Sequence, residues 1–220
     1  MGAVKHAFYK RELVVPADAT TLEGFRRWRR QLGEDAPKVH YIDGDLWFDM
    51  SPQSYRSHLP VVSAINGVLW PLAAEQDLGR YFMDGGWITD AAAGLSNEPD
   101  GFLVLWDTFT SARARLSEDS DAELVGRPDM VLEVLSASSV GKDRALERKY
   151  AQAGVREYWQ IDARRLPLSF RLLQLEGAAY VEIPPNADGF RASRVWERAF
   201  RLRQIEDRLG QPDFRLDARP

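Results

Sequence analysis

The chain has 220 residues, 45% of them hydrophobic, which is enough for one well-filled domain with a real core. Its formal net charge of -4 gives no overall attraction to nucleic acid, and the lack of cysteine excludes disulfides and thiolate metal sites. No apolar run approaches the roughly 20 residues that a membrane span needs and no signal peptide is recognisable, so we expect a cytoplasmic protein without membrane contact.

The N-terminal part predicts a lead-in followed by an amphipathic helix. We expect residues 1–19 to be extended and residues 20–216 to form a single domain. Thr20 or Thr21 can cap a helix that runs to about residue 32, with its apolar residues on one face. This helix also has a basic face, which either contacts phosphate or is simply solvated. The arginines of that face are Arg26, Arg27, Arg29 and Arg30.

Strand and helix patterns then alternate. Asp43-Gly44 lies between two short apolar runs and is a strong hairpin signal. Apolar residues at every third or fourth position predict a helix over residues 58–75. The strands predicted in this part are 39–42, 46–48, 81–88 with an interruption at two glycines, and 102–106, and a polar stretch at 107–123 is predicted to be mostly loop.

The most informative stretch runs from residue 126 to residue 162. It predicts a buried strand that carries Asp129 and Glu133, then a serine-rich turn, a helix from about Lys142 to Gly154, and a further strand. An apolar strand usually excludes carboxylates, because burying an ionised one is expensive without a partner. A bound metal ion is one candidate for that partner.

Short strands dominate the C-terminal part. The pattern predicts strands at 168–175, 180–183 and 190–195, and a short helix around Leu202 and Ile205. There are no repeats and no low-complexity linker. The chain therefore predicts one α/β domain with a peripheral C-terminal β-meander.

Two acids of this pattern can meet. Alternate residues of a strand share a face, so Asp129 and Glu133 point the same way, and Asp100 at the mouth of the preceding strand converges with Glu133 if the two strands pair. Two or three carboxylates with a nearby carbonyl or water suit a hard cation such as Mg²⁺. Such an ion lowers the pKa of a bound water, and Lys142 at the start of the next helix can orient or deprotonate that water.

Several runs, taken together and in order, resemble one family. They are YIDGDLWFDMSP, the helix with His58, EPDGFLV, PDMVLEVLS, KD and AGVREYWQID. From about Thr20 to Leu216 the chain resembles the Uma2 family, once called DUF820, in the PD-(D/E)xK, restriction-endonuclease-like superfamily. The resemblance implies a mixed β-sheet flanked by helices, and a DNA endonuclease that depends on Mg²⁺ or Mn²⁺.

The resemblance also implies the site residues. Asp100 matches the acid of the PD pair and Glu133 the acid of the (D/E)xK motif, so these two would bind the metal. Two residues after Glu133 comes Leu135 in place of the motif's lysine. The better match is Lys142, from the following helix, with Lys149 as the second candidate. The predicted catalytic residues are therefore Asp100, Glu133 and Lys142.

Each of these residues also has a structural interpretation. Glu133 could be an ion-paired structural acid with Arg127 or Arg148 as its partner. Asp129 could support the metal ligands or simply end a strand, and Lys142 could be a solvated surface side chain.

The residues near the site have structural interpretations as well, and the protein as a whole has an alternative function. Asp143 is most simply a helix N-cap, and His58 a capping or surface residue, while the resemblance also allows His58 a role at the rim of the site. Many relatives have a glutamate where this chain has His40, which leaves an auxiliary acid in doubt. The alternative function is a catalytically inactive nuclease-like scaffold that binds nucleic acid or a protein partner. Trp47 and Trp196, if exposed, leave room for a homodimer surface.

Overall fold

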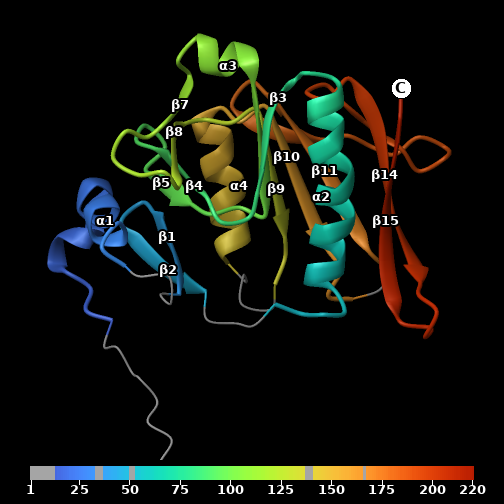
Figure 1. Ribbon diagram of the computed structural model, residues 1–220, viewed down its shortest axis with the longest axis horizontal. Helices are drawn as coiled ribbons and strands as arrows, with labels where there is room; N and C mark the ends of the chain where they lie inside the picture. Colours follow the sequence, from blue (N-terminus) through green and yellow to red (C-terminus); the bar gives the residue numbers. More distant parts are fainter. Residues whose placement is uncertain (1–12, 33–36, 50–52, 137–140, 166) are drawn as a thin grey trace, which may run out of the picture.

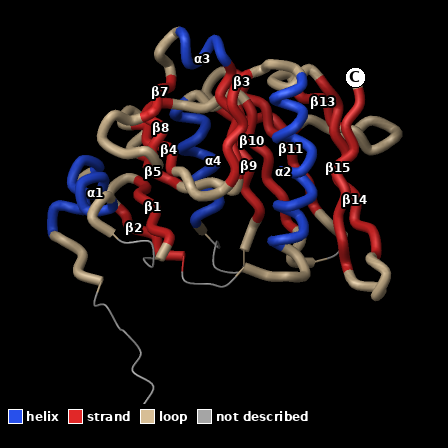
Figure 2. Tube along the Cα trace, in the orientation of Figure 1, coloured by secondary structure: helices blue, strands red, loops and turns tan. Residues whose placement is uncertain are grey.

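The structure is a computed structural model that describes residues 13–32, 37–49, 53–136, 141–165 and 167–220. These residues form two six-stranded sheets, a three-stranded sheet and four α-helices (Figures 1 and 2). No helix of this part of the chain is both long enough and apolar enough to span a membrane.

The central sheet carries most of the predicted pattern. Its strand order is β12-β11-β10-β9-β6-β3, in which β9 runs parallel to β10 and antiparallel to β6. Its strands are β3 (Gly79–Met83), β6 (Gly101–Leu105), β9 (Met130–Val134), β10 (Glu157–Asp162), β11 (Ser169–Glu176) and β12 (Ala179–Glu182).

Two hydrophobic cores cover the two faces of this sheet. On one face, α2 (His58–Glu75) and the three-stranded sheet pack against Met130, Leu132 and Val134. On the other face, α4 (Lys142–Ala153) packs against Val131. The strict alternation along β9 is therefore real, and it directs Glu133 to the α4 side together with Val131.

The second six-stranded sheet lies beside the α4 core and has the order β2-β1-β5-β4-β8-β7. Its strands are β1 (Lys38–Ile42), β2 (Asp45–Asp49), β4 (Trp87–Asp90), β5 (Leu95–Asn97), β7 (Ala114–Leu116) and β8 (Glu123–Gly126). A 3₁₀ turn (Ala17–Thr20) and α1 (Leu22–Arg29) close a third, smaller core against β1. The side chain of Thr21 caps α1 by accepting the Gly24 N–H at 3.1 Å, as predicted.

Several predicted elements are confirmed and several are wrong. The hairpin of β1 and β2, the helix over 58–75 and the helix from Lys142 are present. Residues 81–88 hold the ends of two strands, β3 and β4, that belong to different sheets. The expected loop at 107–123 contains most of α3 (Trp106–Thr110) and all of β7. The extended lead-in contains the 3₁₀ turn, and its residues 1–12 lie outside the described part.

The predicted C-terminal helix is also wrong. Leu202 and Ile205 lie in β14 (Arg198–Glu206), which pairs with β13 (Arg191–Ser193) and β15 (Pro212–Arg219). Phe200 and Leu202 are buried two positions apart, which is the period of a strand and not of a helix. Trp196 is 0% exposed and belongs to the core, so it offers no dimer surface, and Trp47 is only partly exposed.

Candidate active site

The pairing of β6 with β9 brings Asp100 beside Glu133. In this antiparallel register Gly101 lies opposite Leu132, and the Asp100 N–H donates to the Leu132 carbonyl at 3.1 Å. A glycine is needed directly after Asp100, because a β-carbon at position 101 would collide with the Tyr81 hydroxyl. The Asp-Gly pair therefore allows the acid to stand at the end of a tightly packed strand.

Asp100 is held from two directions. Its Oδ2 accepts the Val134 N–H at 2.7 Å, and its Oδ1 lies 3.3 Å from His58 Nε2 at the start of α2. Burial lowers the pKa of His58, but its hydrogen bond to Asp100 and the charge of that acid outweigh burial, so the pKa is raised. Both Asp100 and His58 are buried, which makes this a fixed pair.

Glu133 is held by neutral donors and not by an arginine. Its Oε1 accepts the Tyr150 hydroxyl and the Asn97 amide, each at 2.8 Å. Neither predicted arginine is an ion-pair partner, since Arg127 donates to the Ala153 carbonyl and no described residue pairs with Arg148. Burial raises the pKa of Glu133 to about 7, against the lowering effect of the Lys142 charge.

Lys142 reaches the same place from the first turn of α4. Its Nζ lies 3.2 Å from Nε2 of His40 on β1. Lys142, His40, Asp100 and Glu133 together line a narrow hollow of about 40 Å³. Burial, and then the charge of Lys142, lower the pKa of His40 well below its usual range, so its ring is neutral at neutral pH.

The second candidate lysine points elsewhere. Lys149 is buried, and its Nζ lies 2.5 Å from Asp43 in the hairpin turn and 3.0 Å from Gln152. It does not line the hollow that holds Asp100 and Glu133. Its contacts tie α4 to the β1–β2 turn.

Both the sequence and the fold of this chain are similar to those of known proteins. A family model described as "Uma2: Putative restriction endonuclease" matches residues 22–202. The chain belongs to the Uma2 family. Its structure is also similar to the crystal structure of a putative nuclease belonging to DUF820 from Anabaena variabilis ATCC 29413, with a TM-score of 0.60 and 19% identity over 80% of this chain and 90% of that chain. At this identity the likeness shows the fold alone. No curated protein matches the chain.

Asp129 of this Uma2 protein lies away from the hollow. It accepts the Leu105 N–H at 2.9 Å and pairs with Arg156 at 3.3 Å, so it fixes the start of β9. Asp143 is not the N-cap of α4, which is Gly141, but stands in the first turn of that helix. The strand-edge interpretation of Asp129 is the one that the contacts favour.

Three polar residues around the candidate site are given no role there by the residue pattern alone, and only His58 is linked to the site, through the family resemblance. His58 has the local context of a surface residue, Tyr150 shares an apolar helix face with Leu146, and Asn97 lies in β5 of the other sheet. The available signal is weak, since only the polar run 97–100 before β6 hints that Asn97 belongs with Asp100. The packing of α2 on the central sheet brings His58 to Asp100, and the contact between the two sheets brings Asn97 to Glu133. No local pattern encodes either contact.

Proposed function

We propose that this Uma2 protein is a divalent-metal-dependent endonuclease that hydrolyses phosphodiester bonds in DNA. The observation that carries the proposal is the meeting of two buried carboxylates and a lysine amine in one narrow hollow. Asp100 and Glu133 come from paired strands, and Lys142 comes from the helix that follows the second strand. These are the three groups that the resemblance to the PD-(D/E)xK superfamily implies.

The donor set fits Mg²⁺ or Mn²⁺. Within the described residues, no three His, Cys, Asp or Glu side chains gather into a metal cage. Two carboxylates and the Val134 carbonyl nevertheless suit Mg²⁺, which keeps several of its own waters. The raised pKa of Glu133 indicates that its charge lacks sufficient compensation, which a cation would supply. When bound, such an ion lowers the pKa of a water and offsets charge on the phosphate.

The residues of the chain have separate tasks in this proposal. The Val134 N–H and His58 fix the orientation of Asp100, and Tyr150 and Asn97 fix that of Glu133. Orientation matters because a ligand or base held in place has no reorganisation to undergo during the reaction.

Lys142 is the group that we assign to the attacking water or the charged phosphate oxygen. His40 positions its amine at 3.2 Å, and the amine can hold the water by a hydrogen bond or stabilise developing negative charge. In this proposal the helix supplies the lysine that the motif expects at the position of Leu135.

A DNA cleavage assay tests the metal dependence and the role of Asp100, with a variant of another buried acid as the control. Supercoiled DNA is incubated with the protein in Mg²⁺, in Mn²⁺ and in EDTA. We expect cleavage only with metal, and a loss of about a hundredfold or more in Asp100→Asn. The control is Asp129→Asn, at the other end of β9, assayed where it is folded. Equal cleavage in EDTA or by Asp100→Asn contradicts the proposal, and metal-independent DNA retention without cleavage supports the inactive scaffold.

A pair of lysine variants tests the assignment of Lys142. We expect Lys142→Met to lower kcat by roughly a hundredfold with little change in KM, because the amine acts on the reacting atoms. Lys149→Met removes a lysine of the same helix that contacts Asp43, and it should change stability and not kcat. Loss of kcat in Lys149→Met alone would move the catalytic role to that residue.

A further inference from the structure

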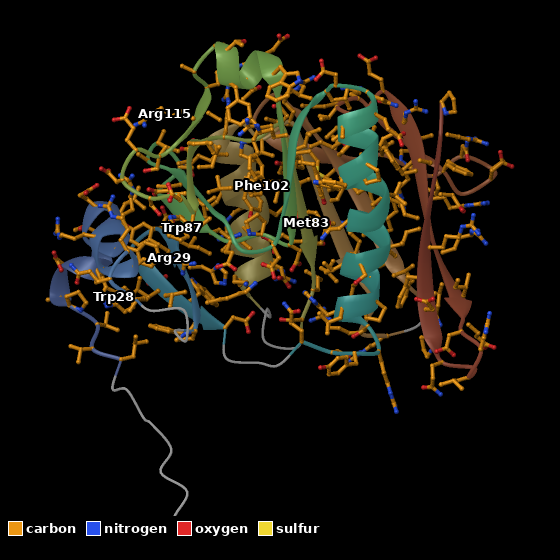
Figure 3. All side chains as sticks on the ribbon, viewed as in Figure 1. Trp28, Arg29, Met83, Trp87, Phe102 and Arg115 are labelled. Carbon is orange, nitrogen blue, oxygen red and sulfur yellow. The ribbon has the colours of Figure 1, made fainter. Side chains whose placement is uncertain are left out.

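A second, larger hollow adjoins the catalytic one. It has a volume of about 510 Å³ and lies between the end of α1, β1 and β4. Lys38 and Glu98 line both hollows, so the two are direct neighbours. Figure 3 shows Arg29 of α1 beside Trp87 of β4 at this place. A ligand bound over Asp100 and Glu133 can therefore extend into the larger hollow.

The larger hollow is lined by three cations, each of which is ion-paired, and Arg29 pairs with Glu98 at 2.7 Å. Arg29, Arg30 and Lys38 line it, against the two acids Glu98 and Asp119. Arg30 pairs with Asp119 at 3.0 Å and Lys38 pairs with Glu98 at 3.0 Å, which holds both cations in place. Their side chains remain 23% and 34% exposed, so an incoming anion can still contact them.

Lys38 stays a cation in this setting. Burial lowers its pKa, but Glu98 and Asp84 outweigh burial and raise it to about 12. Because it stands at the border between the two hollows, its ammonium group can contact a phosphate next to the one bound over the catalytic carboxylates.

The larger hollow also offers a stacked pair of side chains with unused donors. The Arg29 guanidinium lies 4.5 Å from the centroid of the Trp87 ring. Arg29 Nε and Trp87 Nε1 are buried and have no hydrogen-bond partner in the described part of the chain. Both groups only donate, so they call for an acceptor. Beside them Gly85 leaves open space, with nothing within 4 Å of where a β-carbon would stand.

We propose that this hollow is a nucleotide subsite for the residue next to the scissile phosphate, with the base against Arg29 and Trp87 and its phosphate on Arg30 and Lys38. The identity of the neighbouring scissile phosphate rests on the function proposed above. A nucleobase has the acceptors that this pair lacks, and its flat face can stack as bases do on aromatic rings and on arginine planes. The volume falls within the roughly 300–1,000 Å³ of small-ligand sites.

The subsite has a consequence for the substrate. A base that enters the hollow has left the stack of a duplex, so the preferred substrate has an unpaired nucleotide beside the cleavage point. Single strands, splayed ends and mismatches provide such a nucleotide without the cost of extrusion. Fully paired DNA is then the poorer substrate.

Binding in EDTA tests the subsite without requiring catalysis. Fluorescence anisotropy compares a labelled single-stranded oligonucleotide with an abasic backbone of equal length and charge. We expect the wild-type protein to bind the base-containing strand about tenfold more tightly. Trp87→Leu should bind both strands equally. Arg30→Ala should weaken both by a similar factor and reduce the salt dependence of binding by about one phosphate contact.

Three controls keep the result interpretable. Trp70→Leu removes an exposed tryptophan of α2 that does not line the hollow, and it should retain the preference for bases. Trp87→Phe keeps an aromatic ring and should retain part of it. Thermal melts verify that each variant is folded, and if Trp87→Leu fails this check, Trp87→Phe and Arg30→Ala decide.

Two outcomes overturn the subsite. One is a wild-type protein that binds abasic and base-containing strands equally, and the other is a folded Trp87→Leu that keeps the full preference. Neither outcome affects the result of the cleavage test with Asp100→Asn, so the proposed activity is judged separately. Conversely, a base preference that depends on Trp87 in a protein that cuts no DNA would retain the subsite and remove the proposed activity.

Discussion

Two glutamates on neighbouring parallel strands are both buried but have different surroundings. Glu157 starts β10 and is 0% exposed, and Glu133 in β9 is 8% exposed. Both oxygens of Glu157 are satisfied: Oε1 accepts from Ser193 at 2.6 Å and from Trp159 at 2.7 Å, and Oε2 accepts the Arg194 N–H at 3.1 Å. These contacts tie the C-terminal segment to the central sheet.

Among the described residues, Glu133 has fewer hydrogen-bond donors around its carboxylate than Glu157. Donors in the described part of the chain reach only its Oε1, while the residue borders a hollow that also holds Asp100 and Lys142. Burial raises the pKa of both glutamates. The comparison teaches that burial alone does not make a carboxylate a candidate catalytic group, whereas burial next to a hollow shared with a second acid does.

The strongest test of this difference replaces each glutamate in turn by glutamine. Glu133→Gln should lower DNA cleavage by about a thousandfold, since it removes a proposed metal ligand, and should leave the fold intact. Glu157→Gln should keep the activity of the folded protein but lower the free energy of unfolding by about 1–3 kcal/mol, because the amide meets the Arg194 N–H with a donor. Cleavage rates and urea melts measure the two effects, and an exchange of the two phenotypes would refute our assignment.

The pH dependence of stability offers a second test. The pKa of Glu133 rises from 4.5 to about 7 on folding, so the folded state holds a proton in that window that the unfolded state has lost. Stability therefore falls as pH rises from about 4.5 to about 7, by roughly 3 kcal/mol from this residue. Urea melts in EDTA should show this fall for the wild type and a flatter curve for Glu133→Gln. Parallel curves would contradict the raised pKa.

The smallest effect separates the hydroxyl groups that hold the two glutamates. Tyr150→Phe removes one donor from Glu133 and should lower cleavage about tenfold, with about 1 kcal/mol of lost stability. Ser193→Ala removes one donor from Glu157 and should cost a similar amount of stability without changing the cleavage rate per folded molecule. Equal activity losses in both variants would indicate that the hydrogen bonds to Glu133 and those to Glu157 have the same effect on function.

The sequence predicts the local elements of the site better than its assembly. Alternation along β9 predicts which face carries Glu133, and the pairing of β6 with β9, on which the meeting with Asp100 depends, is present. Helix signals correctly place Lys142 at the start of α4. These features depend on residues close together in the chain, where period and capping are informative.

Long-range packing explains what the sequence could not predict. His58 is brought to Asp100 by the packing of α2 on the central sheet, and Asn97 is brought to Glu133 by the contact between two sheets. The glycines at 85 and 86 resemble a break within one strand, although the chain changes sheets there. The arginines of α1 are ambiguous in the sequence because their partners, such as Glu98 and Glu123, are distant along the chain.

The hydrogen bond from Asn97 to Glu133 joins the last residue of β5 in one sheet to β9 in the other. The proposed activity therefore depends on the contact between the two six-stranded sheets, because that contact orients Glu133. Loosening that contact leaves helices and strands in place but releases the carboxylate. In a mild urea titration, cleavage should therefore disappear before the far-ultraviolet circular dichroism changes, and simultaneous loss of both signals would show that the two sheets unfold as one unit.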